Sequence, residues 1–296
     1  MNNYIPQGTI TALVTPFQKG GAIDFDALKD LIQFQIQGGV DAIVVCGSTG
    51  ESATLTLNDK IAIFEKSLEF AAGKIPIIAG TGTNETEGTL NLSTIAFNLG
   101  VSALLLVAPY YNKPTQDGLF EHFKLIADNV GIPIIIYNVP GRTGVNISAE
   151  TQLKLANNCK NIKATKEASG NFEQMMKIIN GAPKDFNLLS GDDIYTIPII
   201  ALGGKGVVSV ISNYAPKQFS DLVKNALNGK FDKARKIHYD LLELMELNFI
   251  ESNPIPVKYA LTLMKKIDSV YRLPLLEMTK KNREIFKKAM QKAGLI

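Results

Sequence analysis

Short β-rich runs alternate with helix-like segments along most of this 296-residue chain. There are eight such runs, and their starts lie about 20 to 35 residues apart, which is the length of one strand-plus-helix unit. Each run is rich in Val, Ile, Leu and Ala, as expected for parallel strands that are covered on both faces. Eight units in series predict an α/β fold in which a closed (β/α)8 TIM barrel is favoured over an open doubly wound sheet. The predicted strands are Thr9–Thr15, Ala42–Cys46, Pro76–Gly80, Ala103–Ala108, Pro133–Asn138, Ile162–Lys166, Asn187–Ser190 and Gly206–Val210.

Helix-start signals lie between these runs. Asp24 is predicted to cap a helix over Phe25–Gln37, which stops at the following glycines. Thr56 and Asp59 resemble a capping box, with Asp in place of the usual Glu. Ser148 and Asn171 are predicted to be further N-caps.

The alternation of strands and helices stops after the eighth unit. Residues 230–296 show only helical periodicity, interrupted at Asn253-Pro254-Ile255-Pro256 and at Leu273-Pro274. No linker rich in Gly, Ser or Pro precedes this segment. We therefore predict a catalytic barrel over residues 1–229 and a C-terminal helical extension over residues 230–296 that packs on the barrel.

Composition and charge exclude several classes of protein. An apolar content of 46% with 20% charged residues is ordinary globular composition. The net charge of +3 comes with lysines spread along helices, which argues against a nucleic-acid-binding surface. No apolar run is long enough for a membrane span, and the N-terminus lacks signal-peptide features. Cys46 and Cys159 have no paired spacing, which indicates a reducing compartment, and we expect a cytoplasmic protein.

Histidine chemistry is also disfavoured. His122 and His238 are the chain's two histidines, and neither has a second ligand at metal-binding spacing. A Ser-His-Asp triad or a zinc site is therefore not expected, and the sequence implies neither a metal nor an organic cofactor. Any chemistry must then rest on Lys, Tyr, Thr, Ser and backbone groups.

Lys166 lies in the sixth run, where an apolar core residue would be expected, and Tyr137 lies near the end of the fifth. A lysine in an apolar interior must either ionise at a high cost or stay neutral, and a neutral amine is a nucleophile. Schiff-base formation needs that neutral state, and a nearby tyrosine hydroxyl can transfer the protons. The alternative is a strand-end lysine whose ammonium reaches solvent.

Other unusual residues follow the strands, at the end of the barrel where active sites lie. The loop Gly47–Glu51 offers two hydroxyls and backbone N–H groups that could cradle a carboxylate, although a plain glycine turn is an alternative. Tyr110 and Tyr111 follow the fourth strand, and packing alone could explain them. Arg142 follows the fifth strand and could pair with a carboxylate, although a lone loop arginine can also be simply solvated. With Lys166, these residues place an amine, several hydroxyls and a cation over one end of a barrel.

Three further motifs are set aside. The run Gly80-Thr81-Gly82-Thr83-Asn84-Glu85 lacks the third glycine of a dinucleotide fingerprint. The run Gly203-Gly204-Lys205-Gly206 leads into a strand, whereas a P-loop leads into a helix. Asp192-Asp193 has no neighbouring carboxylate or histidine to complete a metal site, so we predict a helix N-cap there.

Five motifs in this order resemble the dihydrodipicolinate synthase branch of the pyruvate-dependent class I aldolases, the family that includes N-acetylneuraminate lyase. The resemblance extends from about Gly8 to the C-terminus. The motifs are Gly47-Ser48-Thr49-Gly50-Glu51-Ser52, Ala108-Pro109-Tyr110-Tyr111-Asn112-Lys113-Pro114, Tyr137-Asn138-Val139-Pro140-Gly141-Arg142-Thr143-Gly144, Lys166-Glu167-Ala168-Ser169-Gly170 and Asn253-Pro254-Ile255-Pro256-Val257-Lys258.

The resemblance implies a condensation of pyruvate with L-aspartate 4-semialdehyde to 4-hydroxy-tetrahydrodipicolinate, a lyase-class reaction of lysine and diaminopimelate biosynthesis. Lys166 would form the Schiff base, and Tyr137 would donate and accept protons. Ser48 and Tyr111 would complete a hydroxyl relay, with Tyr111 reaching into the neighbouring subunit's site. No metal takes part in such chemistry, because the protonated imine itself withdraws electrons from the pyruvate methyl group.

The same resemblance implies the binding residues and the assembly. Thr49 and the backbone of Val208 would hold the pyruvate carboxylate, and Arg142 would bind the carboxylate of the semialdehyde. Family members are usually homotetramers built as dimers of dimers.

Two alternatives to this function remain open. One is a lyase that acts on a longer 2-oxo acid such as N-acetylneuraminate or 2-keto-3-deoxygluconate. Ser48 is compatible with it, because the synthases commonly have Thr at this position and the lyases often have Ser. The sugar-acid lyases lack the Gly141–Gly144 motif, which favours the synthase. The other alternative is a pyruvate-binding regulator without catalytic activity.

Feedback by L-lysine is expected to be weak or absent. Sensitive relatives bind lysine between subunits, and this chain matches their site at Ser52, Ala53, Asn84 and Tyr110. The two histidine positions hold Leu57 and Lys60 instead, and the glutamate position holds Gly88. Lys60 would add a like charge where an ammonium ligand needs a carboxylate. Glu85 or Glu87, within one helical turn of Gly88, could substitute for the missing glutamate.

Overall fold

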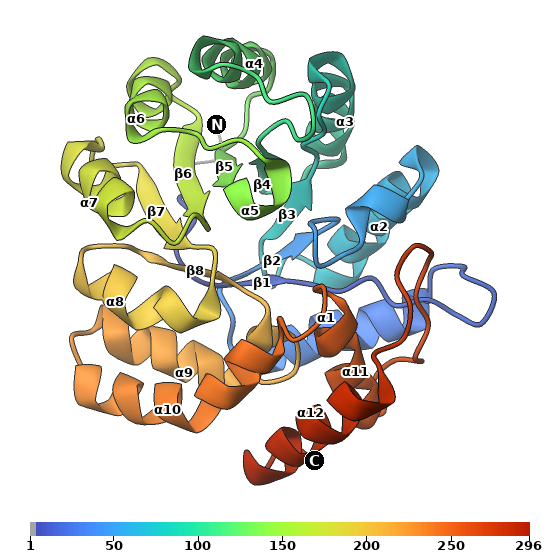
Figure 1. The fold of residues 1–296 in the computed structure, drawn as a ribbon. Coiled ribbons are helices and arrows are strands. Elements are labelled where there is room, and N and C mark those ends of the chain that lie inside the picture. The colour runs from blue at the N-terminus through green and yellow to red at the C-terminus, as the bar shows by residue number, and fades with distance from the viewer. Residues whose placement is uncertain (1–3) are drawn as a thin grey trace.

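The structure, a computed structural model, describes residues 4–296 and confirms the predicted TIM barrel (Figure 1). Eight strands form a closed barrel in chain order, and the first pairs in parallel with the last. Each strand lies within or close to its predicted range. The strands are β1 (Gly8–Ala12), β2 (Ala42–Val45), β3 (Ile77–Gly80), β4 (Ala103–Val107), β5 (Ile134–Asn138), β6 (Ile162–Glu167), β7 (Asn187–Ser190) and β8 (Gly206–Ser209).

The first strand is shorter than predicted. β1 ends at Ala12, whereas the sequence predicted a strand as far as Thr15. Beyond Ala12 the chain bonds to loops at the carboxyl end of the barrel: the Val14 N–H donates to Asn213 Oδ1 (3.0 Å), and the Thr15 hydroxyl donates to the Gly50 carbonyl (2.7 Å). These partners are far away in sequence, which is why an apolar run alone predicted a longer strand.

Helices surround the barrel and confirm the predicted caps. Asp24, Ser148 and Asn171 each accept a hydrogen bond from a backbone N–H at the start of their helix. Thr56 and Asp59 form the predicted capping box. The helices are α1 (Phe25–Gly38), α2 (Leu57–Ala71), α3 (Thr86–Leu99), α4 (Gln116–Asn129), α5 (Pro140–Thr143), α6 (Ala149–Asn158), α7 (Phe172–Gly181), α8 (Thr196–Ala201) and α9 (Pro216–Leu227), with 3₁₀ turns η1 (Ser52–Thr54), η2 (Asp193–Tyr195) and η3 (Ile211–Asn213).

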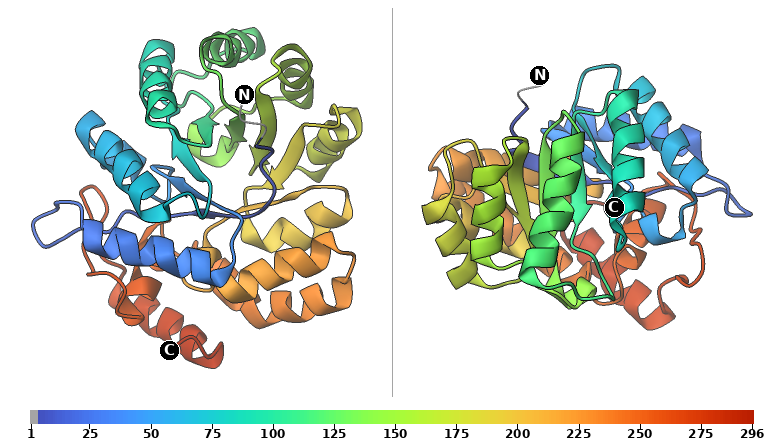
Figure 2. Two further views of the ribbon diagram at one scale, coloured as in Figure 1. Left: turned by 180° about the vertical axis from the view of Figure 1, so that it is seen from behind. Right: turned by 90° about the horizontal axis from the view of Figure 1, so that it is seen from above.

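The C-terminal segment is helical, as predicted, and consists of α10 (Phe231–Leu247), α11 (Ile255–Leu263) and α12 (Lys280–Lys292). α10 packs on α9, and α12 contacts α10 and α11. Figure 2 (right) shows α11 and α12, in red, at the end of the barrel opposite the N-terminus, the end where α5 also lies. The division of the chain into two units at residue 229 stays a prediction. No helix within residues 4–296 is long and apolar enough to cross a membrane.

The apolar core has two layers. The larger layer lies between the strands and the surrounding helices, and the smaller one fills the barrel interior with residues such as Ile10, Val44, Ile135 and Val208. Because side chains alternate across a strand, each strand contributes to both layers. Tyr137 belongs to the interior cluster, so the last inward-facing residues of the strands border the site described next.

Candidate active site

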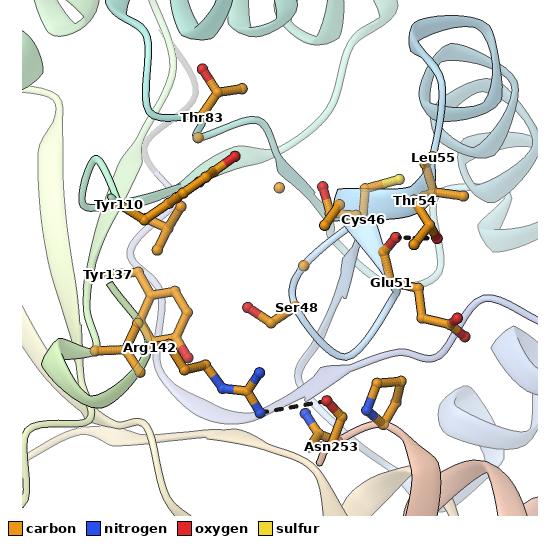
Figure 3. A pocket seen from close by; sticks show the side chains of 18 of the residues that line it. Cys46, Ser48, Glu51, Thr54, Leu55, Thr83, Tyr110, Tyr137, Arg142 and Asn253 are labelled. Atoms are coloured by element: carbon orange, nitrogen blue, oxygen red, sulfur yellow. Dashed lines mark hydrogen bonds between the residues drawn. The ribbon is translucent and has the colours of Figure 1, made fainter. Parts of the chain in front are cut away.

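A cavity of about 430 Å³ lies over the carboxyl ends of the strands (Figure 3). Ser48, Tyr137 and Arg142 line it, as predicted for one shared site, and Asn253 of the C-terminal segment joins them. In Figure 3 the Ser48 hydroxyl points towards the Tyr137 ring, and the Arg142 guanidinium extends towards Asn253. The hydroxyl of Ser48, the phenol of Tyr137 and the guanidinium of Arg142 therefore border a single cavity large enough for small organic acids.

Lys166 lies beside Tyr137 inside the barrel. The two residues are paired in the register of β5 and β6, and Lys166 Nζ lies 4.1 Å from the centroid of the Tyr137 ring. Lys166 is only 5% exposed, which disfavours the alternative of a strand-end lysine that simply reaches solvent. A buried amine next to a phenol has the arrangement that imine chemistry with proton transfer requires.

The loop Gly47–Glu51 is closed by its own backbone. The Gly50 N–H donates to the Gly47 carbonyl (3.0 Å), and the Glu51 N–H donates to the Ser48 carbonyl (3.1 Å). These two N–H groups are therefore engaged within the loop, so the predicted cradle for a carboxylate must rely on other groups. Gly80 on β3 lets the loop approach, because a Cβ there would lie 2.3 Å from the Cys46 carbonyl oxygen.

The C-terminal segment supports this loop from outside the barrel. Asn253 Nδ2 donates to the Thr49 hydroxyl (2.9 Å), and Lys258 Nζ lies 2.6 Å from Glu51 Oε1. Both side chains of the Lys258–Glu51 pair are 0% exposed, and the Lys258 ammonium also lies 4.4 Å from the centroid of the Phe17 ring. Burial lowers the pKa of Lys258, and the charge of Glu51 opposes that shift.

Arg142 lies in α5, at the rim of the cavity. Its Nη2 donates to the Asn253 carbonyl at 3.4 Å, and no carboxylate within residues 4–296 lies at ion-pair distance from it. Several guanidinium donors are thus left for a ligand carboxylate. Asp192 follows β7; burial raises the pKa of its carboxyl, and the charges of Lys166 and Arg142 oppose that shift.

Tyr111 is not brought to the cavity of its own chain. Its side chain is 89% exposed, its φ is 76°, and it is absent from the cavity lining. Thr49 and Val208 are both buried, with Thr49 held by Asn253 and Val208 on the inner face of β8. Of the four residues predicted to be catalytic, Ser48 and Tyr137 line the cavity, and Lys166 contacts Tyr137 inside the barrel without being among the lining residues. Tyr111 lies apart.

The predicted effector residues lie partly on the same cavity. Ser52, Ala53 and Tyr110 line it together with Lys60, whereas Asn84 does not. Burial lowers the pKa of Lys60. The carboxylate of Glu85, one of the two substitutes considered for the missing glutamate, accepts hydrogen bonds from the N–H groups of Glu87 and Gly88 and so caps α3.

The predicted N-cap at Asp192-Asp193 is wrong. Asp192 precedes η2 but makes no side-chain cap there. Asp193 Oδ2 instead accepts hydrogen bonds from the N–H groups of Val210 (3.1 Å) and Ile211 (2.8 Å), at the start of η3. Burial raises the pKa of Asp193 to about 6. The tertiary contact with the segment after β8 replaces the local cap.

Three supporting residues had no role in the sequence-based interpretation, although all lie in the motifs of the family resemblance. Asn253 and Lys258 hold the loop that carries Ser48 and Thr49, and Glu167 is completely buried beside Lys166. A usable signal existed for Lys258, because it is a charged residue within the apolar helix Ile255–Leu263.

The fold and the position of this cavity are those of a TIM-barrel enzyme. The chain belongs to the dihydrodipicolinate synthetase family, whose sequence model matches residues 5–293.

Relatives match over nearly the whole chain. A 4-hydroxy-tetrahydrodipicolinate synthase of Chlorobium phaeobacteroides is 48% identical over 98% of both sequences. The crystal structure of dihydrodipicolinate synthase from Aquifex aeolicus has a TM-score of 0.96 and 47% identity, covering 98% of this chain and 99% of that one. A chloride-inhibited dihydrodipicolinate synthase from Acinetobacter baumannii, complexed with pyruvate, is 41% identical with a TM-score of 0.96, covering 98% of this chain and 99% of that one.

Proposed function

We propose that this chain condenses pyruvate with L-aspartate 4-semialdehyde to give 4-hydroxy-tetrahydrodipicolinate, the activity for which its relatives are named. The observation that carries the proposal is the buried Lys166 amine, 4.1 Å from the centroid of the Tyr137 ring at the carboxyl end of the barrel. The pyruvate complex of the Acinetobacter relative supports pyruvate as one substrate. The two alternatives, a lyase for longer 2-oxo acids and a non-catalytic regulator, are disfavoured by the names of these relatives.

In the proposed reaction Lys166 attacks the C2 carbonyl of pyruvate, and water leaves to give a protonated imine. The imine withdraws electrons from the methyl group, which loses a proton to form an enamine, and the enamine carbon attacks the aldehyde. Tyr137 is the proton donor and acceptor, because its ring lies against the lysine. Ser48 borders the same cavity and continues the relay.

The substrate carboxylates are assigned to different parts of the site. Thr49 and the backbone of Val208 are proposed to hold the pyruvate carboxylate, which places it near the buried lysine. Arg142 is proposed to bind the semialdehyde carboxylate at the rim, since it has no carboxylate partner within residues 4–296. Uncharged hydroxyl and backbone donors would thus bind the pyruvate carboxylate, and the guanidinium would bind the carboxylate of the semialdehyde.

Borohydride reduction in the presence of pyruvate tests the covalent residue. We expect a mass increase at Lys166, none in the Lys166→Ala variant, and an unchanged adduct in Lys163→Ala. Lys163 is a matched control on the same strand, but its ammonium pairs with Asp185 at the surface. An adduct elsewhere, or none, would refute the assignment. Turnover of N-acetylneuraminate instead of the semialdehyde would identify the lyase, and an adduct without any turnover would identify the regulator.

We also propose that the chain acts in the cytoplasm as a homotetramer, in which Tyr111 completes the relay of a neighbouring subunit. The exposure of this tyrosine supports the proposal, because an 89% exposed phenol on a rigid loop is available to a second copy. Native mass spectrometry should detect the tetramer, and Tyr111→Phe should reduce turnover. A fully active monomer would contradict this proposal.

We also propose that feedback by L-lysine is weak, because of the residues at the effector positions. Lys60 lines the cavity beside Ser52 and Ala53, so an ammonium ligand there would meet a like charge. Glu85 is engaged at the start of α3, which leaves Glu87 as the remaining candidate of the two substitutes for the missing carboxylate.

A further inference from the structure

Glu167 is a completely buried carboxylate that is held by amides. Asn138 Nδ2 donates to both of its oxygens at 3.0 Å, and the side-chain amides of Gln152 (2.9 Å) and Gln174 (3.0 Å) donate to Oε2. The Ser169 N–H donates to Oε1 at 2.9 Å. No cationic side chain within residues 4–296 lies at ion-pair distance from Glu167.

A buried carboxylate without a cation has a high desolvation cost, so four converging donor groups are needed to hold it. Charge-assisted hydrogen bonds are shorter and stronger than neutral ones, and together these fix the carboxylate in one position. The donors come from four segments: β5, α6, α7 and the turn after β6.

The position of this network relates it to the proposed reaction. In the register of β5 and β6, Tyr137 is paired with Lys166 and the next residues, Asn138 and Glu167, are paired with each other. Successive side chains of a strand point to opposite faces. The Asn138–Glu167 contact therefore lies behind the Tyr137–Lys166 contact, on the outer face of the same two strands.

Asn138 is itself fixed on its other side. Its Oδ1 accepts the Ile147 N–H at 2.9 Å, and its Nδ2 also donates to Asn146 Oδ1 at 2.7 Å. The segment before α6 thus anchors Asn138, and Asn138 anchors Glu167. A shift of one strand against the other would break hydrogen bonds to a buried charge, which costs more than the loss of neutral ones.

We propose that Asn138 and Glu167 are positioning residues, which hold Tyr137 and Lys166 in the geometry for proton transfer. The inference rests on the proposed function, because it assigns Tyr137 and Lys166 their roles. Proton transfer depends steeply on the distance between donor and acceptor, and a misplacement of about 1 Å can cost about 100-fold in rate. Attack of the lysine amine on pyruvate tolerates more variation, since pyruvate itself can shift in the cavity.

The test separates these two steps. Borohydride trapping with pyruvate measures imine formation, and exchange of the pyruvate methyl protons with deuterium, followed by NMR, measures proton transfer. Glu167→Gln keeps the shape of the side chain but presents an NH2 group to the amide donors around it. We expect trapping within about 2-fold of the unmodified protein and methyl exchange reduced about 10- to 100-fold.

Two further variants distinguish positioning from a general loss of stability. Gln152→Leu removes one donor to Glu167 but leaves the Asn138 contact, so exchange should stay near the unmodified rate. The double variant Asn138→Asp/Glu167→Gln restores a carboxylate facing an amide across the two strands but loses the hydrogen bond to Asn146, so it should recover part of the exchange lost in Glu167→Gln. If Glu167→Gln does not fold, Asn138→Ser provides the same comparison, because the serine hydroxyl is too short to span the contact.

The inference is wrong if Glu167→Gln exchanges methyl protons at the unmodified rate, or if Gln152→Leu loses as much exchange as Glu167→Gln. It is also wrong if trapping and exchange fall together in Glu167→Gln. Failure of the proposed function has a different signature: the unmodified protein would then show neither trapping at Lys166 nor methyl exchange.

Discussion

Replacing Lys258 by methionine should strongly destabilise the protein. Lys258 Nζ lies 2.6 Å from Glu51 Oε1, and both side chains are 0% exposed. Methionine fills a similar volume, but it leaves the Glu51 carboxylate buried without its cation, and Oε2 of that carboxylate has no hydrogen-bond partner to compensate. Removing one partner of a buried ion pair costs about 3–5 kcal/mol. This is a large fraction of the roughly 5–15 kcal/mol by which a folded domain is stable.

Urea unfolding followed by circular dichroism at neutral pH measures the loss. The matched control is Lys292→Met, which breaks an exposed pair with Glu243 (2.8 Å) and should cost less than about 1 kcal/mol. The double variant Lys258→Met/Glu51→Gln removes both buried charges and should regain most of the loss, because no uncompensated charge remains.

The outcome that would refute this reasoning is a Lys258→Met variant no less stable than Lys292→Met. A double variant less stable than Lys258→Met would also refute it, since the uncompensated charge of Glu51 would then not be the cause. If the reasoning holds, Lys258→Met should in addition weaken pyruvate binding, because Glu51 ends the loop that carries Ser48 and Thr49.

Three further predictions follow from the site and from buried groups. Arg142→Ala should lower kcat/KM for the semialdehyde by the equivalent of about 2–4 kcal/mol while pyruvate trapping persists, and equal damage to both would contradict its role. Burial lowers the pKa of His122 from 6.5 to about 4, so the unfolded chain binds its proton first as the pH falls. The free energy of unfolding should therefore decrease by about 3 kcal/mol between pH 6.5 and 4 through this group, and His122→Gln should flatten that part of a urea-unfolding pH series. L-Lysine should inhibit turnover weakly in a steady-state assay, and strong inhibition below about 1 mM would show that the effector site persists with other residues.

The fold could be predicted because its signals are local. Each strand is a short apolar run bounded by helix-start or turn residues, and eight of them in series leave few alternatives to a barrel. Because the predicted strands are parallel, their carboxyl ends all lie at one end of the barrel. The sequence alone therefore placed Ser48, Tyr137, Arg142 and Lys166 at that end. The end of β1 was missed because the partners of Val14 and Thr15 lie in distant loops.

The supporting residues were missed for the same reason. Asn253 and Lys258 act through hydrogen bonds to residues more than 200 positions away, and Asp193 accepts hydrogen bonds from the segment after the neighbouring strand β8. The rule that singled out Lys166, a charged side chain in an apolar element, applies equally to Lys258 in α11 and to Glu167 at the end of β6. Applied to every charged residue, it would have indicated both, although it could not have named their partners.

The Lys258–Glu51 pair also has a consequence for the order in which the molecule is made. The two residues are 207 positions apart, so at about 5–20 residues per second a ribosome needs about 10–40 s after Glu51 to add its partner. Throughout that time the loop with Ser48 and Thr49 has no buried cation beneath it. A chain that is cut short before α11 can form strands for all eight positions and still lack the support of this loop. The loop therefore gains its buried cation only once α11 has been made, and a chain cut short before α11 is left without it.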